Sequence, residues 1–153
     1  MGTYVPHNSV SGSNYEFGHD EELLHIQIMR SKGYNIIPAK KLEDAFKKVD
    51  YWLIHNEKKY GVDVKTAQPR SGDFCISCSK SHIIEGLVIY FAFRIKGFIY
   101  FVKASDIQKH LTAGDFTVRD SQQITRTGQP LNNAFFYLTP SDVVKMSCKQ
   151  ISI

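Results

Sequence analysis

Two acids and a lysine in the first half of the chain have residue types and a spacing that could perform chemistry on a phosphate. Asp63 and Lys65 belong to the stretch YGVDVKT, residues 60–66, and Asp50 precedes them. Because side chains alternate along a strand, Asp63 and Lys65 share one face and the neighbouring valines share the other. Mg²⁺ prefers oxygen ligands, so Asp50 and Asp63 could supply its carboxylates. Lys65 is a compact positive charge that could neutralise charge developing on a phosphate.

The same stretch also fits a purely structural role. In an edge strand with a solvated outer face, Asp63 and Lys65 would form a surface ion pair worth about 0–1 kcal/mol. Clustered carboxylates, by contrast, repel one another, and without a cation at least one of them should keep its proton to higher pH. The surroundings of this strand therefore decide between the two interpretations.

A helical glutamate could add a third carboxylate. Residues 19–33 predict a helix, with acids in its first turn, basic residues near its end and a terminal glycine. Glu21 and Glu22 both stand in this first turn, where either could simply favour the helix dipole. Counted back from the predicted end, Glu22 lies on the stripe that contains Ile26 and Met29. We therefore expect Glu22 to be the site residue, with Glu21 as the alternative.

The remaining pattern predicts an α/β domain with a mixed sheet. Alternating and β-branched residues favour strands, while turn residues mark the ends of helices. The predicted elements are a short strand at 34–39, a turn or short helix at 40–49, a hairpin at 50–67 with its tip at 56–59, a loop at 68–74, a strand end or short helix at 75–86, two core strands within 87–104, a helix at 105–114 capped by Ser105, a strand at 134–138 and a helix at 139–149.

Length and composition predict one globular domain. The chain has 153 residues and 42% hydrophobic content, and no apolar window approaches the roughly 18 residues of a membrane span. Residues 1–18 lack a secretory pattern and predict a flexible arm before a single domain at 19–153. Three cysteines fit a reducing compartment, so a cytoplasmic location is expected. The net charge of +4 suits a polyanionic partner.

The order of these residues resembles the PD-(D/E)xK nuclease superfamily, which includes restriction endonucleases and junction resolvases. Asp50, twelve intervening residues and the tripeptide Asp63, Val64, Lys65 match its motif, although "VD" stands here in place of "PD". The resemblance covers residues 19–103. It implies a restriction-endonuclease-like αβββαβ core, a mixed central sheet flanked by helices, and a variable appendage at 104–153.

The resemblance also implies roles for individual residues. Asp50, Asp63 and the backbone carbonyl of Val64 would bind Mg²⁺, with Mn²⁺ able to substitute, and Glu22 would hold a second cation or its water. Lys65 would orient or activate the attacking water. The expected function is a divalent-metal-dependent DNA endonuclease that hydrolyses phosphodiester bonds. A homodimer is expected, in which each subunit cuts one strand. The alternative is a catalytically inactive nuclease-like module that binds DNA or another protein.

Other polar residues are weaker candidates. Basic loop residues could grip DNA phosphates or could simply be solvated, namely Lys58, Lys59, Arg70 and Lys80. Gln68 follows the lysine at a position where a further polar site residue is common in the superfamily. Cys75 and Cys78 form a CxxC, with His82 and Cys148 further along. Because the CxxC alternates like a strand, it predicts two thiols rather than a zinc site.

Overall fold

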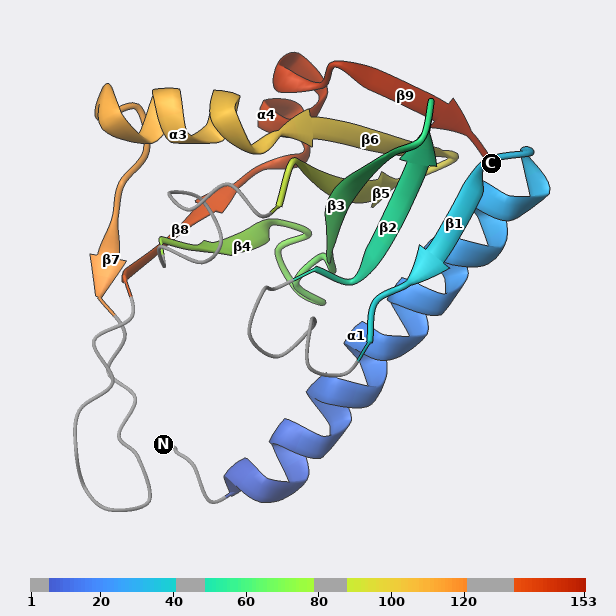
Figure 1. The fold of residues 1–153 in the computed structure, drawn as a ribbon. Helices are drawn as coiled ribbons and strands as arrows, with labels where there is room; N and C mark the ends of the chain where they lie inside the picture. The colour runs from blue at the N-terminus through green and yellow to red at the C-terminus, as the bar shows by residue number, and fades with distance from the viewer. Residues whose placement is uncertain (1–5, 41–48, 79–87, 121–133) are drawn as a thin grey trace.

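The protein is a mixed α/β fold, as the sequence predicted (Figure 1). The computed structural model describes residues 6–40, 49–78, 88–120 and 134–153. The elements within these ranges are α1 (Pro6–Ser31), β1 (Asn35–Pro38), β2 (Tyr51–His55), β3 (Lys58–Lys65), β4 (Phe74–Ser77), β5 (Tyr90–Ile95), β6 (Phe98–Lys103), α3 (Ala104–Thr112), β7 (Arg119–Asp120), β8 (Ala134–Leu138), α4 (Pro140–Met146) and β9 (Lys149–Ser152).

The described strands form two sheets. The larger sheet has the order β1-β2-β3-β5-β6-β9, and the smaller has the order β4-β8-β7. Within the larger sheet β3 and β5 pair in parallel, while the other neighbouring pairs are antiparallel. The predicted hairpin corresponds to β2 and β3, and the predicted core strands correspond to β5 and β6. The mixed sheet is therefore confirmed.

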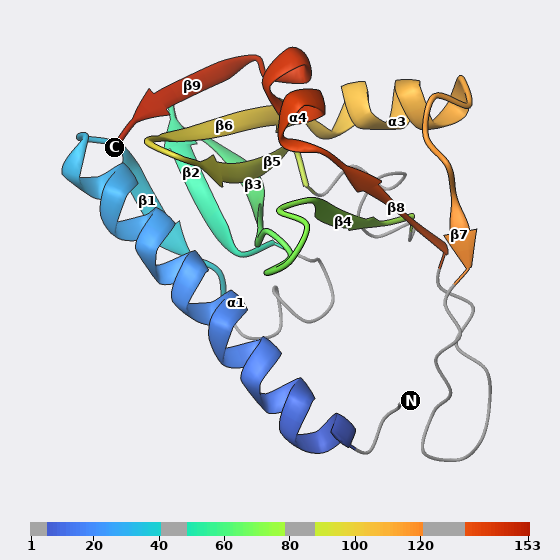
Figure 2. The ribbon, with the colours of Figure 1, turned by 180° about the vertical axis from the view of Figure 1, so that it is seen from behind.

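The larger sheet buries both of its faces. Helix α1 lies along one face, and the smaller sheet with α3 and α4 lies on the other, as the two opposite views show (Figures 1 and 2). Val62 and Val64 belong to the core cluster on the α1 side. Asp63 pairs in register with Phe91, which belongs to the other core cluster. β3 is thus an interior strand, and the solvated edge strand considered for Asp63 and Lys65 is excluded.

Helix α1 begins at Pro6, so residues 6–18 of the expected N-terminal arm are helical and continuous with the predicted helix. Proline suits the first position of a helix because its missing N–H would have no partner there and its fixed φ angle is already helical. Once packing of the apolar stripe has formed the later turns, adding further helical residues toward the N-terminus costs little free energy, because no new nucleus is needed. Glu21 and Glu22 consequently lie about four turns into the helix and not in its first turn, so a role in offsetting the dipole is removed.

Two other expectations need correction. Ser105 was expected to cap the helix that follows β6, but α3 begins at Ala104, with Lys103 at the cap position and no side-chain cap hydrogen bond. The helix starts as soon as the strand ends, which leaves Ser105 inside the first turn. The predicted appendage at 104–153 also contributes β9 to the larger sheet, where it pairs with β6. The expectations for residues 41–48 and 79–87 lie outside the described residues.

The described helices do not cross a membrane. None of them is both long and apolar enough to do so. Helix α1 is long, but it contains polar and charged residues throughout its sequence.

Candidate active site

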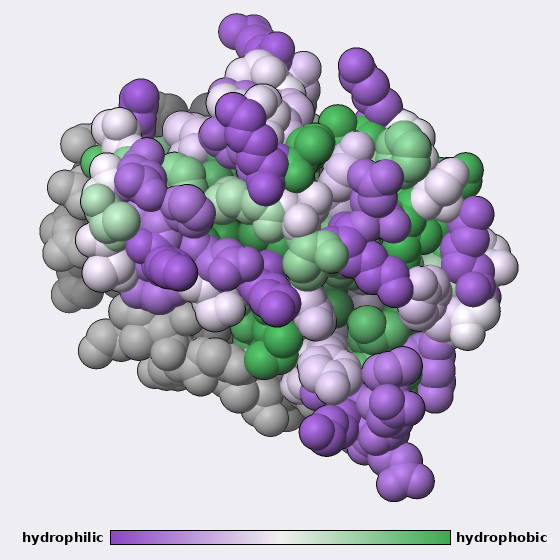
Figure 3. Space-filling view, turned by 90° about the horizontal axis from the view of Figure 1, so that it is seen from above, coloured by the Kyte–Doolittle hydropathy of each residue, from purple (hydrophilic) through white to green (hydrophobic). Residues whose placement is uncertain are grey.

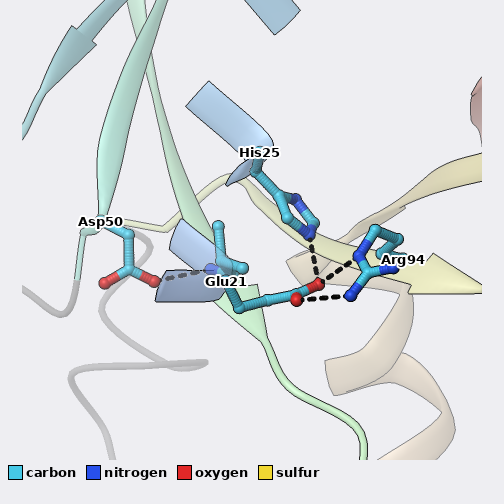
Figure 4. Close-up of polar contacts among 5 residues, drawn as sticks. Glu21, His25, Asp50 and Arg94 are labelled. Carbon is cyan, nitrogen blue, oxygen red and sulfur yellow. Dashed lines mark hydrogen bonds and ion pairs between the residues drawn. The ribbon is translucent and has the colours of Figure 1, made fainter. Parts of the chain in front are cut away.

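Asp50 lies at the mouth of the β2–β3 hairpin and is fixed there by the backbone of β3. Its N–H donates to the Val62 carbonyl at 2.8 Å, and its Oδ2 accepts from the Val64 N–H at 2.6 Å. The latter contact is drawn as the dashed line from Asp50 in Figure 4. Asp50 therefore extends the pairing of the two strands and directs its carboxyl group to the backbone of the Asp63-Val64-Lys65 tripeptide.

Asp63 and Lys65 are close together on the opposite face of β3 from the valines. Lys65 Nζ lies 3.4 Å from Asp63 Oδ2. Asp63 is only 5% exposed, and the Lys65 side chain is 17% exposed. The Lys65 Nζ also lies 5.6 Å from the centroid of the Phe91 ring. Both groups lose hydration when they are buried, and their surroundings must offset that cost. The pair is therefore not the solvent-exposed salt bridge considered from the sequence.

Glu22 joins Asp50 from helix α1. The Glu22 side chain hydrogen-bonds to the Asp50 carboxyl, and His19 Nδ1 lies 3.4 Å from Glu22 Oε2. Burial raises the pKa of Asp50 strongly, and the nearby charges of Asp63 and Glu22 raise it further, although the Val64 N–H opposes the shift. A hydrogen bond between two carboxyl groups requires a proton on one of them. Without a cation, Asp50 therefore carries that proton.

Glu21 points elsewhere and forms a structural network. Its Oε1 accepts from Arg94 Nη2 at 2.8 Å, and its Oε2 accepts from Arg94 Nε at 2.9 Å and lies 3.0 Å from His25 Nε2 (Figure 4). Burial would raise the pKa of Glu21, but the hydrogen bonds and charges of His25 and Arg94 outweigh it and lower the pKa from 4.5 to about 2. Glu21 thus anchors α1 to β5 and leaves Glu22 next to Asp50.

We expect Glu21→Gln to destabilise the protein in a pH-dependent way. Because folding lowers the pKa of Glu21 from 4.5 to about 2, its carboxylate stabilises the fold at pH values above about 4.5 and loses this effect as the pH falls toward 2. The expected loss at neutral pH is about 2 kcal/mol, since solvent screens part of the interaction with the half-exposed Arg94. Urea unfolding of both proteins between pH 7 and pH 2 measures the difference.

The exposed neighbour Asp20 provides the control for this measurement. Asp20→Asn should leave the free energy of unfolding nearly unchanged across the same pH range. The difference between wild type and Glu21→Gln should close below pH 4.5. A difference that stays constant down to pH 2 would show that the Glu21 carboxylate is not the stabilising species.

The donors at this site fit a hard divalent cation, although they are few. Among the residues that the structure describes, no group of three or more His, Cys, Asp or Glu side chains is arranged to hold a metal. Mg²⁺ does not need such a group, because it commonly takes one or two carboxylates and completes its shell with waters and substrate phosphate. Asp50 and Asp63 with the Val64 carbonyl would supply such a set. The accumulated carboxyl groups, one of which must keep a proton, are the structural sign that positive charge is in deficit here.

Of the basic residues predicted to grip DNA, Lys58 and Lys59 lie away from this site. Lys58 and Lys59 lie at the tip of the hairpin, at the opposite end of β3 from Lys65, and Lys59 Nζ lies 4.6 Å from the Trp52 ring centroid. A hairpin necessarily separates its tip from its mouth. Arg70 and Gln68 instead line a hollow of about 460 Å³ in the loop that follows Lys65. Lys80 lies outside the described residues.

The three cysteines are free. Burial raises the pKa of both the Cys75 and the Cys78 thiol, and the charge of Lys65 partly offsets this effect at Cys75. Cys148 Sγ lies 3.3 Å from the Phe101 carbonyl oxygen, and Phe101 belongs to the α1 face of the sheet. The described residues contain no group of three or more metal-binding side chains that includes these thiols. His82 lies outside them.

Sequence reasoning missed Arg94 and His25, which hold the helix in phase. The only signal for Arg94 was a charged residue in the apolar stretch YFAFRI, where a buried strand would normally exclude it. His25 is fully buried, and its position four residues after Glu21 places both on one helix face. Neither signal identifies its partner.

Comparison with known proteins gives no family assignment. No protein-family model matches the chain, and no curated protein matches it.

Proposed function

We propose that this protein is a divalent-metal-dependent DNA endonuclease. The observation that carries the proposal is that Glu22 of α1 hydrogen-bonds to Asp50, just before β2, while the charge of Asp63 on β3 acts on the same carboxyl group. Lys65 lies beside Asp63 on that strand. Carboxyl groups that are buried or half-buried near one another oppose folding unless something positive compensates them. The hydrogen bond between Glu22 and Asp50 and the nearby charge of Asp63 therefore favour a function that uses a cation.

The order and pairing of the helices and strands also support a restriction-endonuclease-like core. Helix α1 and the first four strands of the larger sheet along the chain, β1, β2, β3 and β5, follow the expected αβββαβ order, and β5 lies next to β3 in parallel. Strand β4, between β3 and β5 in the chain, belongs to the smaller sheet. The helix expected before the last strand would fall in the connection between β3 and β5. Part of that connection, residues 79–87, lies outside the described residues. The core assignment therefore rests on α1, the β1–β2–β3 meander and the parallel β3–β5 pair.

Each side chain has a distinct role in the proposed reaction. Mg²⁺, when bound by Asp50, Asp63 and the Val64 carbonyl, would supply the positive charge that polarises the scissile phosphodiester. Lys65, held beside Asp63, would orient the attacking water and neutralise charge that develops on the phosphate. Glu22 would add a carboxylate on the helix side of the site. The Val64 N–H holds Asp50 in place throughout.

A second function class remains the alternative, namely an inactive nuclease-like module that binds DNA or another protein. An inactive relative would be expected to lack an acid or the lysine, whereas all four residues are present here and lie together. The net charge of +4 suits DNA in either case. We further propose that the protein acts as a twofold dimer, because a domain of this size that cuts a duplex needs one site for each strand. We also propose a cytoplasmic location, since the three cysteines are free.

Digestion of a panel of DNA substrates tests the proposal. Supercoiled, linear, single-stranded and four-way-junction DNA should be incubated with Mg²⁺ or Mn²⁺ and, in parallel, with excess chelator. Cleavage of at least one substrate that disappears with chelator supports the proposal. Cleavage that survives excess chelator, or no cleavage of any substrate by folded protein, would favour the alternative.

We expect Mn²⁺ to raise the melting temperature of the wild type and not that of Asp50→Asn. A cation that binds only the folded state stabilises by mass action. Because folding raises the pKa of Asp50, keeping this carboxyl group protonated in the folded protein costs free energy at pH values above its ordinary pKa of 3.8. Asn can still accept from the Val64 N–H, so Asp50→Asn should melt a few degrees higher than the wild type without cation. Thermal melts at pH 7, with and without Mn²⁺, measure both effects.

Asp115→Asn is the matched control, because Asp115 is an exposed acid that pairs with His110 away from the site. Its melting temperature should rise with Mn²⁺ as much as that of the wild type. An equal Mn²⁺ response in Asp50→Asn would remove Asp50 from the proposed set of ligands.

A further inference from the structure

The larger sheet contains a second candidate site, on the face opposite Asp63 and Lys65. This sheet is curled, so that its edge strands β1 and β9 come near each other (Figure 1). Lys149 at the start of β9 has its Nζ 5.1 Å from the ring centroid of Tyr34, which lies just before β1. A cavity of about 400 Å³ opens on the concave side, and residues from α1 and from five strands of the sheet line it. This volume lies within the range of about 300–1,000 Å³ that is usual for small-ligand sites.

Aromatic rings line this cavity. Tyr60, Tyr90 and Phe101 stand on three neighbouring strands, with ring centroids 6.3 Å apart for the first pair and 6.2 Å for the second. Tyr34 also lines the cavity, with its ring under Lys149 Nζ. The tyrosine rings are only half-buried, whereas Phe101 is 3% exposed and forms part of the floor. Half-exposed rings around an apolar floor provide flat surfaces on which a planar group could stack.

The rim of the cavity is positively charged. Lys103 and Lys149 are exposed at its edge, and none of the described residues that line it is acidic. Lys103 pairs in register with Tyr90, and Lys149 pairs in register with Phe101, so each lysine lies beside one of the aromatic residues of the cavity. The top of the molecule in Figure 1, where β9 and the hairpin tip lie, shows hydrophobic residues between projecting hydrophilic side chains (Figure 3).

We propose that this aromatic pocket binds a nucleotide, with its base stacked on Tyr60 or Tyr90 and its phosphate at Lys103 and Lys149. A nucleotide has a planar base that can stack on the aromatic rings and an anionic phosphate that can pair with the lysines at the rim. Only an unpaired nucleotide fits, because a base inside a duplex does not expose its face. The pocket would thus give the protein a preference for single-stranded or locally opened DNA.

The pocket and the proposed active site share strand β3. Tyr60 and Asp63 lie on opposite faces, three residues apart, which corresponds to about 10 Å along a strand. The proposal adds a substrate preference to the proposed endonuclease, and its biological meaning rests on that function. Binding itself does not, because it needs no cation and can be measured in the presence of chelator.

The test is a binding experiment on the full chain with excess chelator. Fluorescence anisotropy measures a labelled oligodeoxythymidylate, with a duplex of the same length for comparison, and calorimetry measures thymidine monophosphate and thymidine. We expect the single strand to bind more tightly than the duplex, and the monophosphate more tightly than thymidine. A single strand that binds no more tightly than the monophosphate would identify a free nucleotide as the ligand, within the same proposal.

Variants locate the binding. Tyr90→Ala should weaken binding of the single strand by about tenfold, whereas Tyr90→Phe retains the ring and should bind like the wild type. Lys103→Ala should weaken binding and reduce the salt dependence by about one unit of slope, and it removes only an exposed side chain. Lys109→Ala, which removes an exposed lysine on α3, is the control and should have no effect.

Two results would overturn the proposal. One is the absence of binding by both thymidine monophosphate and the single strand to folded protein. The other is binding that neither Tyr90→Ala nor Lys103→Ala weakens. Nucleotide binding without any Mg²⁺-dependent cleavage would instead count against the endonuclease alone, so the two proposals fail separately.

Discussion

Asp63→Ala is expected to lose both cation binding and cleavage. Asp63 is the buried carboxylate beside Lys65, and its charge is one of those that keep a proton on Asp50. Removing it takes away a proposed cation ligand and the partner of the lysine together. We expect the single-turnover cleavage rate to fall at least about a thousandfold, which corresponds to about 4 kcal/mol of lost transition-state stabilisation. Calorimetry with Mn²⁺ should detect no binding at the site.

A second substitution separates this effect from misfolding. Asp63→Asn preserves the shape of the side chain, and it should also lose activity while retaining a cooperative thermal transition. Asp115→Ala removes an exposed acid that pairs with His110 and should cleave like the wild type. If Asp63→Asn folds and still cleaves at the wild-type rate, Asp63 does not bind a catalytic cation.

Lys65→Ala is expected to separate catalysis from cation binding. The Lys65 ammonium lies 3.4 Å from Asp63 Oδ2 and is proposed to act on the water and the phosphate. We expect the single-turnover rate to fall about a hundredfold, or about 3 kcal/mol. The Mn²⁺ affinity should remain or rise, because a positive charge has been removed next to a proposed ligand. DNA affinity measured in Ca²⁺ should change only by the loss of one phosphate contact.

Lys65→Met is the companion variant, since it retains an apolar stem next to the Phe91 ring without the charge. Lys109→Ala serves as the control for the removal of a lysine. Cleavage at the wild-type rate in both Lys65 variants would mean that Asp63 and Lys65 form only a structural ion pair. In that case the module interpretation would become the better one.

The sequence by itself determined the local arrangement of the site. Alternation along a strand placed Asp63 and Lys65 on one face, and the polar tip between two β-branched stretches predicted the β2–β3 hairpin with Asp50 at its mouth. The continuous apolar stretches predicted β5 and β6. These features depend on side-chain periods of two residues and on turn chemistry, both of which act between residues near one another in the chain.

The tertiary structure decided which glutamate joins the site. Sequence counting favoured Glu22 from an uncertain helix start, and the helix in fact begins at Pro6. What fixes the rotation of α1 is the hydrogen-bonded pair between Glu21 and Arg94, 73 residues apart. A contact over such a separation leaves no period in the local sequence, so only the folded chain shows that Glu21 faces β5 and Glu22 faces Asp50.

The tertiary structure also decided that β3 is an interior strand and that the sheet encloses an aromatic pocket. β5 pairs with β3 in parallel, and β9 joins the sheet from the last residues of the chain. Tyr60, Tyr90 and Phe101 belong to three separate stretches of the sequence, and only strand register places their rings side by side. Strand order depends on the burial of both sheet faces by the whole chain, and no local window of sequence contains that information.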